Sequence, residues 1–172
     1  RNRMEAVHRR RAGAAGPDQE ACYPAFMADL LARLFPSATD DERSRLLREA
    51  TDYELDMESR LLVPRAALRR LMEALHARGK RILLISDMYL PAGHLQRLAA
   101  SAGLAPLVDG VVSSADSGRA KASGAAWPLV RDRFRLDPER WLHVGDNPVS
   151  DGLRPAGFGI RAAVLRDPGE RA

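Results

Sequence analysis

The apolar residues of this chain follow one pattern up to about residue 62 and another beyond it. In the first part they recur every three or four positions, which is typical of amphipathic helices. Three such segments follow one another without a strand pattern between them, at residues 1–15, 24–35 and 39–61. The first is basic and only weakly amphipathic, whereas Thr39 begins the last with a capping side chain and acids in the first turn. We therefore expect residues 1–62 to form a helical region.

From residue 63 onward, short apolar runs alternate with helical patterns. The sequence predicts strands at residues 82–86, 108–113, 141–146 and 158–165. Helical patterns occupy residues 67–75, 91–102, 123–134 and 149–156. Strands and helices that alternate in this way form βαβ units with right-handed crossovers around a parallel sheet. The fold class predicted for residues 63–172 is therefore α/β, with a parallel sheet flanked by helices.

The predicted strand at 82–86 ends in polar residues. Four consecutive apolar residues suit a strand buried on both faces, and Ser86 and Asp87 stand at its end. Pro91 then fits the first turn of the next helix. Open α/β sheets bind ligands at the carboxyl ends of their strands, and a helix N-terminus there favours a phosphate. Ser86 is therefore a candidate phosphate ligand.

Two further groups of polar residues lie at predicted strand ends or in the loops after them. They are Lys121 and the segment Gly-Asp-Asn-Pro-Val-Ser-Asp at 145–151. A hydroxyl, a fixed cation and a pair of carboxylates suit phosphoryl transfer with Mg²⁺, because that reaction depends mainly on positioning and charge neutralisation. Each group alone has a plainer interpretation, as a helix cap, a solvated charge or a turn. Their order and their common placement favour a phosphate site.

Composition narrows the classes of function. The net charge of +4 comes from arginine, since Lys80 and Lys121 are the only lysines, and the few aromatic residues form no base-stacking pattern. We therefore expect no nucleic-acid partner. The apolar runs are too short to cross a membrane and no signal peptide is visible, so we expect no membrane association. Cys22 is the single cysteine, which excludes an internal disulfide and makes the cytoplasm the expected location.

Three longer strings carry a family resemblance. In chain order, motifs II, III and IV of the haloacid dehalogenase (HAD) superfamily resemble Ile85-Ser-Asp-Met-Tyr-Leu-Pro91, Lys121-Ala-Ser-Gly124 and His143-Val-Gly-Asp-Asn-Pro-Val-Ser-Asp151. The strings look like those of a bacterial branch of HAD hydrolases whose members are sometimes joined to glycosyltransferase domains. The resemblance covers residues 64–165. It implies a HAD-like Rossmannoid sheet, a helical C1-type cap over residues 1–62, a small phosphorylated substrate, and a fused or associated glycosyltransferase partner.

The resemblance also implies roles for single residues. Ser86 would hydrogen-bond the transferring phosphoryl group, Asp87 would support the phosphate site, and Lys121 would hold the charge of nucleophile and phosphate. Asp146 would coordinate Mg²⁺ directly, and Asp151 would bind or orient the ion.

Two other residues of the third string would act less directly. Asn147 would stand behind the metal ligands and support them. His143 lies within the predicted strand, so we expect it to be a packed residue rather than a ligand.

One part of the HAD pattern is missing from the sequence. HAD catalysis begins with an Asp-x-Asp motif at the end of a first strand, whose first aspartate attacks phosphorus and whose second acts as acid and base. The nearest match, Asp-Met-Glu at 56–58, lies in a helical pattern. The missing strand would sit between the strands that carry Ser86 and Asp146, and without it two edges should be unpaired. We therefore expect a chain truncated upstream of Arg1.

Two hypotheses for the function follow. The first is a Mg²⁺-dependent phosphohydrolase that acts on a small phosphorylated substrate in an intact form with the missing aspartate. The second is a catalytically silent HAD-like module that binds a phosphorylated ligand or a partner such as a glycosyltransferase. Within the superfamily, a phosphonatase is disfavoured because residues 1–79 contain no lysine for a Schiff base. A dehalogenase is disfavoured because it needs no pair of metal-binding carboxylates, and a phosphomutase stays open.

Overall fold

The computed structural model describes residues 2–15, 18 and 20–165 of the chain. The helices, in chain order, are α1 (Asn2–Ala15), α2 (Tyr23–Leu34), α3 (Asp40–Leu61), α4 (Ala66–His76), α5 (Ala92–Ser101), α6 (Ser114–Ser117), α7 (Ala126–Phe134) and α8 (Arg154–Ala156). The strands are β1 (Leu83–Ser86), β2 (Gly110–Ser113), β3 (Leu142–Gly145) and β4 (Arg161–Val164). Three shorter helical turns are η1 (Ala105–Leu107), η2 (Pro138–Arg140) and η3 (Pro148–Leu153).

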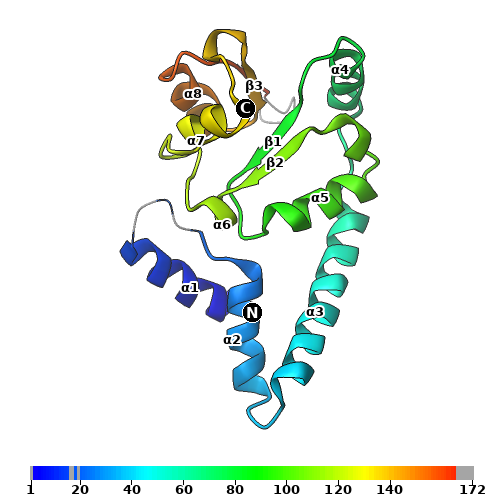
Figure 1. Ribbon diagram of the computed structural model, residues 1–172, viewed down its shortest axis with the longest axis vertical. Helices are drawn as coiled ribbons and strands as arrows, with labels where there is room; N and C mark the ends of the chain where they lie inside the picture. Colours follow the sequence, from blue (N-terminus) through cyan, green and yellow to red (C-terminus); the bar gives the residue numbers. More distant parts are fainter. Residues whose placement is uncertain (1, 16–17, 19, 166–172) are drawn as a thin grey trace, which may run out of the picture.

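Helices α1 to α3 form the helical region expected from the sequence (Figure 1). The start of α3 is capped on both sides: Thr39 Oγ1 accepts a hydrogen bond from Glu42 N at 3.3 Å, and the Glu42 carboxylate accepts one from Thr39 N at 2.7 Å. This reciprocal capping box satisfies two backbone donors that a helix start leaves unpaired. The helices predicted at 24–35 and 39–61 are confirmed, and the one predicted at 1–15 is present from Asn2 onward. None of the described helices is long and apolar enough to span a membrane.

A hydrophobic cluster joins the helical region to the rest of the chain. Leu90, from the loop after β1, and Leu98, from α5, contribute to it. Its buried members are Met4, Ala21, Tyr23, Phe26, Met27, Leu55, Leu90 and Leu98. The helices therefore pack together with the loop that follows the first strand, across the predicted boundary near residue 62.

The four described strands form two parallel pairs. Strand β1 pairs with β2 and β3 pairs with β4, and no hydrogen bonds join the two pairs among the described residues (Figure 1). The registers place Ser86 opposite Ser113 and Gly145 opposite Val164, so paired strands end together. The parallel pairing and the alternation with helices confirm the predicted α/β fold class.

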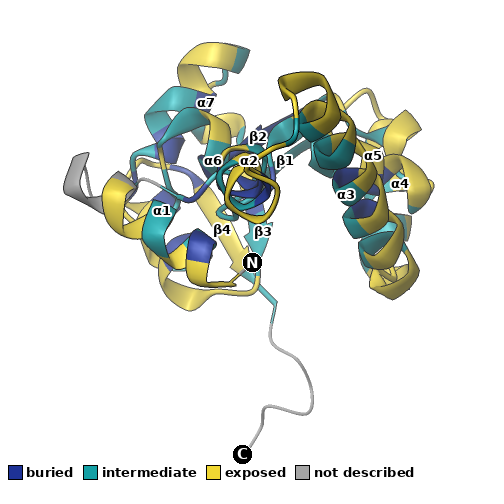
Figure 2. Cartoon of the chain, turned by 90° about the horizontal axis from the view of Figure 1, so that it is seen from below, coloured by how far each residue is buried: buried dark blue, intermediate teal, exposed yellow. Residues whose placement is uncertain are grey.

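The side of the fold where β1 and β3 are unpaired is poorly covered. All four residues of β1 are only half-buried, and Leu142 at the start of β3 is 53% exposed. Helix α4 has an apolar stripe, yet none of its residues, all of which are described, is buried (Figure 2). Leu71 on this stripe is 42% exposed. The strand and the helix are thus only partly covered.

One predicted element differs from the structure. The sequence predicts a regular helix over 149–156, but the chain forms the wide π-helical turn η3 and then the short α8. Pro148 and Pro155 have no N–H to donate, and the Asn147 side chain accepts hydrogen bonds from the first two free N–H groups of the turn. Wide turns of this kind occur frequently at functional sites.

Candidate functional site

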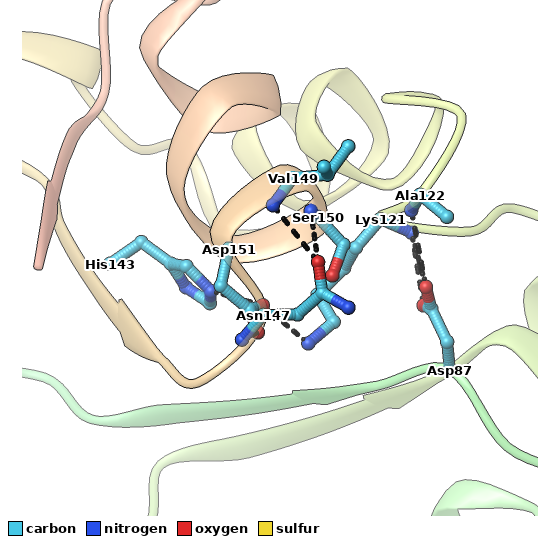
Figure 3. A network of polar contacts seen from close by, with 8 residues as sticks. All are labelled: Asp87, Lys121, Ala122, His143, Asn147, Val149, Ser150 and Asp151. Carbon is cyan, nitrogen blue, oxygen red and sulfur yellow. Dashed lines mark hydrogen bonds and ion pairs between the residues drawn. The ribbon is translucent and has the colours of Figure 1, made fainter. Parts of the chain in front are cut away.

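Three loops meet at the carboxyl ends of the strands. They are the loop after β1, the loop before α7 and the turn after β3, and they bring together Asp87, Lys121, Asn147 and Asp151 (Figure 3). These residues come from three separate segments of the sequence, and the structure brings them together at strand ends or in the loops after them, where the sequence predicted them. The network contains one cation and two carboxylates in a partly buried setting.

The centre of the network is the Asp151 carboxylate, which is 2% exposed. Its Oδ1 lies 2.6 Å from Lys121 Nζ and 2.9 Å from His143 Nε2, and its Oδ2 accepts a hydrogen bond from Asn147 N at 3.1 Å. Burial raises the pKa of Asp151, but the hydrogen bonds from Lys121 and His143 outweigh it and lower the pKa to about 2. Asp151 is therefore ionised at neutral pH and holds Lys121 as an ion pair.

Gly145 at the end of β3 makes room for this carboxylate. A Cβ atom on Gly145 would overlap the Asp151 carboxyl group, so a larger residue would have to displace it. The glycine of the Gly-Asp segment is thus required by the close approach of a side chain. Its role in the site is steric.

Asp87 holds the loop that presents Lys121. Its carboxylate accepts hydrogen bonds from Lys121 N at 2.9 Å and from Ala122 N at 3.2 Å. Arg154 donates from Nε to the carbonyl oxygen of Ala122 at 2.8 Å and so holds the same loop from α8. These contacts give Asp87 a positioning role, while the predicted support of a phosphate by Asp87 stays a prediction.

Among the predicted site residues, Ser86 and Asp146 have side chains that make no hydrogen bond or ion pair with a described residue. Ser86 is half-buried at the end of β1 and its hydroxyl makes no hydrogen bond with a described residue. Asp146 is exposed, and its carboxylate has neither a hydrogen bond nor an ion pair within the described part of the chain. A hydroxyl donor and a carboxylate that are both unpaired are suited to bind a ligand.

Asn147 caps the turn that carries Asp151. Its Oδ1 accepts hydrogen bonds at 2.9 Å from both Val149 N and Ser150 N. The side chain is therefore occupied within the turn, and its backbone N–H is the group that reaches Asp151. A supporting role for Asn147 agrees with these contacts, although its predicted relation to a metal stays a prediction.

His143 belongs to the network more closely than the sequence indicates. It is buried as expected, but it also hydrogen-bonds Asp151 and its ring meets the ring of Trp127 edge-on at 4.7 Å. Burial lowers the pKa of His143, against the opposing effect of Asp151. The one signal in the sequence was that His143 is a polar residue at an inward position of an apolar strand. That signal does not identify Asp151, eight residues later, as its partner.

The residues present fit Mg²⁺, the ion that the family resemblance implies. Mg²⁺ is commonly held by one or two carboxylates, with waters and substrate phosphate as its other ligands. Asp146 offers an unpaired carboxylate, and Asp151 Oδ2 accepts a single hydrogen bond and has a lone pair left. Among the described residues there is no group of three or more His, Cys, Asp or Glu side chains that could hold an ion unaided. The two carboxylates therefore suit an ion that a phosphate helps to bind.

Two other places are unsuited to the predicted chemistry. Asp56, in the nearest match to an Asp-x-Asp motif, lies on α3 and forms an exposed ion pair with Arg60. A shallow hollow lined by residues such as Val112, Ser117 and Arg133 contains none of the predicted site residues. The strand-end network remains the candidate site.

This chain has a lysine, a serine and aspartates at or near the carboxyl ends of its parallel strands. Such an arrangement is typical of the α/β proteins that bind charged ligands there. The family described as haloacid dehalogenase-like hydrolase matches residues 7–153. The chain therefore belongs to this family of hydrolases. No curated protein matches it.

Solved structures agree with this assignment. A HAD phosphatase from Thermococcus onnurineus is 20% identical, with a TM-score of 0.60 over 87% of this chain and 79% of its own length. A 2-haloacid dehalogenase from Pseudomonas syringae pv. Tomato DC3000 is 19% identical, with a TM-score of 0.67 over 99% of this chain and 73% of its own. A hydrolase from Streptococcus pneumoniae TIGR4 is 13% identical, with a TM-score of 0.52 over 86% of each chain. At these identities the likeness shows the fold alone.

Proposed function

We propose that this chain forms the phosphate-binding and metal-binding part of a Mg²⁺-dependent phosphohydrolase for a small phosphorylated substrate. The observation that supports it best is the buried Lys121–Asp151 ion pair, beside which Ser86 and Asp146 are unpaired. Membership of a hydrolase family supports hydrolysis as the reaction class. The shared fold with the Thermococcus onnurineus phosphatase supports a phosphate ester as the substrate.

Each residue of the site has a task in this proposal. Ser86 donates its hydroxyl hydrogen to a phosphoryl oxygen, and Lys121, held in place by Asp151, places its ammonium beside the negative charge that builds up there. Asp146 and Asp151 would hold Mg²⁺, which when bound supplies further charge neutralisation. Asp87 keeps the Lys121 loop in position through its two backbone hydrogen bonds.

The nucleophile in this proposal is an aspartate on an extended segment that pairs with the free edges of β1 and β3. Among the described strands, each of these two is paired on one side only. Such edges present a row of unpaired N–H and C=O groups, which a further strand would satisfy. The half-buried residues of β1 and the uncovered stripe of α4 also support a segment at this place. A parallel strand there would end beside Ser86.

A phosphate-binding module without hydrolysis is the competing function, with a protein partner such as a glycosyltransferase. One observation favours it: none of the four described strands ends in an Asp-x-Asp sequence. The two functions share Ser86 and Lys121 as phosphate contacts. They differ in whether a bound phosphate ester is cleaved.

Hydrolysis of para-nitrophenyl phosphate separates these functions. The chain is assayed alone and with whatever natural sequence precedes Arg1 in its gene, each with Mg²⁺ or with a chelator. We expect Mg²⁺-dependent release from the extended form, reduced about 100-fold or more by Asp146→Asn. Asp41→Asn, which alters an exposed carboxylate in the first turn of α3, is the matched control and should leave the rate unchanged.

Two outcomes would decide against the hydrolase. Full activity in the Asp146→Asn variant would remove the metal role assigned to that carboxylate. Binding of inorganic phosphate without hydrolysis in the extended form would favour the silent module.

A further inference from the structure

We propose that His143 is a positioning residue of the same site, which fixes the Lys121 ammonium by holding the carboxylate that Lys121 binds. The effect of His143 on phosphate binding rests on the function proposed above, whereas its effect on the position of the Lys121 ammonium does not. His143 touches neither the unpaired Ser86 hydroxyl nor the unpaired Asp146 carboxylate through any hydrogen bond in the described chain. Its contact with the site is made through Asp151.

The first argument is that His143 and Lys121 share one oxygen atom. Lys121 Nζ and His143 Nε2 lie 2.6 and 2.9 Å from the same Oδ1 of Asp151 and reach it from different sides (Figure 3). An ionised carboxylate only accepts hydrogen bonds, so His143 Nε2 must carry the hydrogen. Oδ1 is thereby held between two donors, while Oδ2 accepts a hydrogen bond from Asn147 N.

The second argument is that the imidazole itself cannot move away. His143 is buried in β3, and Trp127, which is 0% exposed, packs edge-on against its ring at 4.7 Å. Trp127 in turn packs against Trp141 at 5.7 Å. The strand and the two indole rings therefore fix the direction in which His143 Nε2 points.

The third argument concerns the lysine. A lysine side chain has four flexible carbons, so its ammonium is placed only as well as its partner is placed. Among the described residues, Asp151 Oδ1 is the partner of Lys121 Nζ, and Asp151 is itself on the wide turn η3. Without His143, that oxygen would be held by Lys121 alone. His143 thus converts a flexible ion pair into a fixed one.

The experiment uses the unusual scarcity of lysine in this chain. Labelling lysine with ¹³C at Cε gives only two signals, from Lys121 at the site and from the exposed Lys80, which serves as an internal control. In the full chain we expect NMR relaxation to show an ordered Lys121 Cε and a mobile Lys80 Cε. His143→Leu removes the donor at similar volume and should make Lys121 as mobile as Lys80.

Two amide variants test the hydrogen bond apart from packing. In His143→Gln the amide nitrogen reaches the place of Nε2, so Lys121 should stay ordered. In His143→Asn the amide is too short to reach Asp151, so Lys121 should become mobile. This pair of chemically matched variants also decides the question if His143→Leu does not fold. An ordered Lys121 in His143→Asn, or a mobile one in His143→Gln, would overturn the proposal.

Binding of inorganic phosphate, measured by calorimetry on the same proteins, extends the test to the site. Loss of a hydrogen bond that orients a ligand group typically costs about 10–100-fold in affinity or activity, and we expect a loss in this range for His143→Leu but not for His143→Gln. If the unaltered chain and its extended form both fail to bind phosphate, the proposed function fails, while the lysine signals still decide the role of His143. Unchanged phosphate affinity in His143→Leu, with binding intact, would overturn its role in the site.

Discussion

The helical cluster and the strand ends of this molecule are organised by different forces. The helical region is organised around apolar and aromatic side chains: Phe26 is 0% exposed and its ring contacts those of Tyr23 and Tyr89. At the strand ends, by contrast, β1 has no buried residue, and the loops are joined by hydrogen bonds and one buried ion pair. The comparison indicates that apolar packing organises the helical cluster, whereas polar contacts organise the strand ends.

This difference has a physical consequence for substitutions. Apolar burial is non-directional and roughly proportional to area, so its loss lowers the free energy of unfolding. Polar networks fix directions, and the loss of one member disturbs the others more than it reduces buried area. Substitutions in the two regions should therefore give different signatures, in stability for the first and in ligand chemistry for the second.

The largest effect is expected for Phe26→Ala. Truncation of a fully buried aromatic ring should lower the free energy of unfolding by about 3–5 kcal/mol, because a cavity replaces its contacts. Urea denaturation measures the change. Phe35→Ala is the matched control, since Phe35 is 45% exposed, and it should cost much less. Equal losses from the two variants would show that the burial of Phe26 in the helical cluster contributes no more to stability than an exposed ring does.

Next in size is the loss of catalysis expected for Lys121→Met, assayed as phosphate-ester hydrolysis in the extended form of the proposed function. Removal of a preorganised charge that stabilises the transition state typically costs about 10²–10³-fold in rate, and we expect kcat/KM to fall by this factor. Lys80→Met is the control, because Lys80 is the only other lysine and is exposed. A Lys121 variant as active as the Lys80 variant would contradict the assigned role.

A smaller effect is the pH dependence that Asp151 confers on stability in chelator-containing buffer. Its pKa of about 2 in the folded protein lies below its ordinary value of 3.8. Stability from this group is therefore complete above the ordinary value and is lost as the pH falls toward 2. The difference corresponds to about 2 kcal/mol, with no large discount for screening because the side chain is buried.

Urea denaturation at about pH 5 and about pH 2.5 measures this contribution, since most of it is lost between these two conditions, both of which lie above the folded pKa of about 2. The Asp151→Asn variant cannot ionise at this position and should lose less stability between the two conditions than the unaltered chain. The same loss in both proteins would show that Asp151 does not carry the depressed pKa.

The smallest effect is expected for Leu71→Ala on the uncovered stripe of α4. Leu71 is 42% exposed, so its truncation should change the free energy of unfolding by about 0.5 kcal/mol or less in the present chain. In the extended form, where the proposed segment would cover this side, the same change should cost about 2 kcal/mol or more. An equally small cost in both forms would argue against a segment that packs there.

The sequence predicted the elements and the gathering of the site residues well, because both depend on local pattern. Apolar runs ending in polar residues identified β1 and β3, and parallel strands necessarily bring Asp87, Lys121 and Asp151 to one side. The part that His143 plays was not predictable in the same way. Its partner is defined by the shape of a π-helical turn, which follows from two prolines and an asparagine cap rather than from any periodicity.

The contribution of Leu90 was hidden for a related reason. In the sequence, Leu90 belongs to the segment 85–91, which resembles a phosphate-binding motif. Nothing local indicates that its side chain enters a cluster built mainly from helices. The exposure of the α4 stripe was equally unpredictable, since amphipathic spacing indicates which face is apolar but not what covers it. Long-range packing decides both.

The loop between β1 and α5 is fastened to both sides of the molecule. Leu90 is 1% exposed, and Tyr23 N donates to the carbonyl oxygen of Tyr89 at 2.9 Å, while Ser113 Oγ donates to that of Leu90 at 2.7 Å. The start of α2 and the end of β2 thus both form hydrogen bonds with neighbouring residues of this loop. A movement of α2 would therefore be transmitted to this loop and to the end of β1 that carries Ser86.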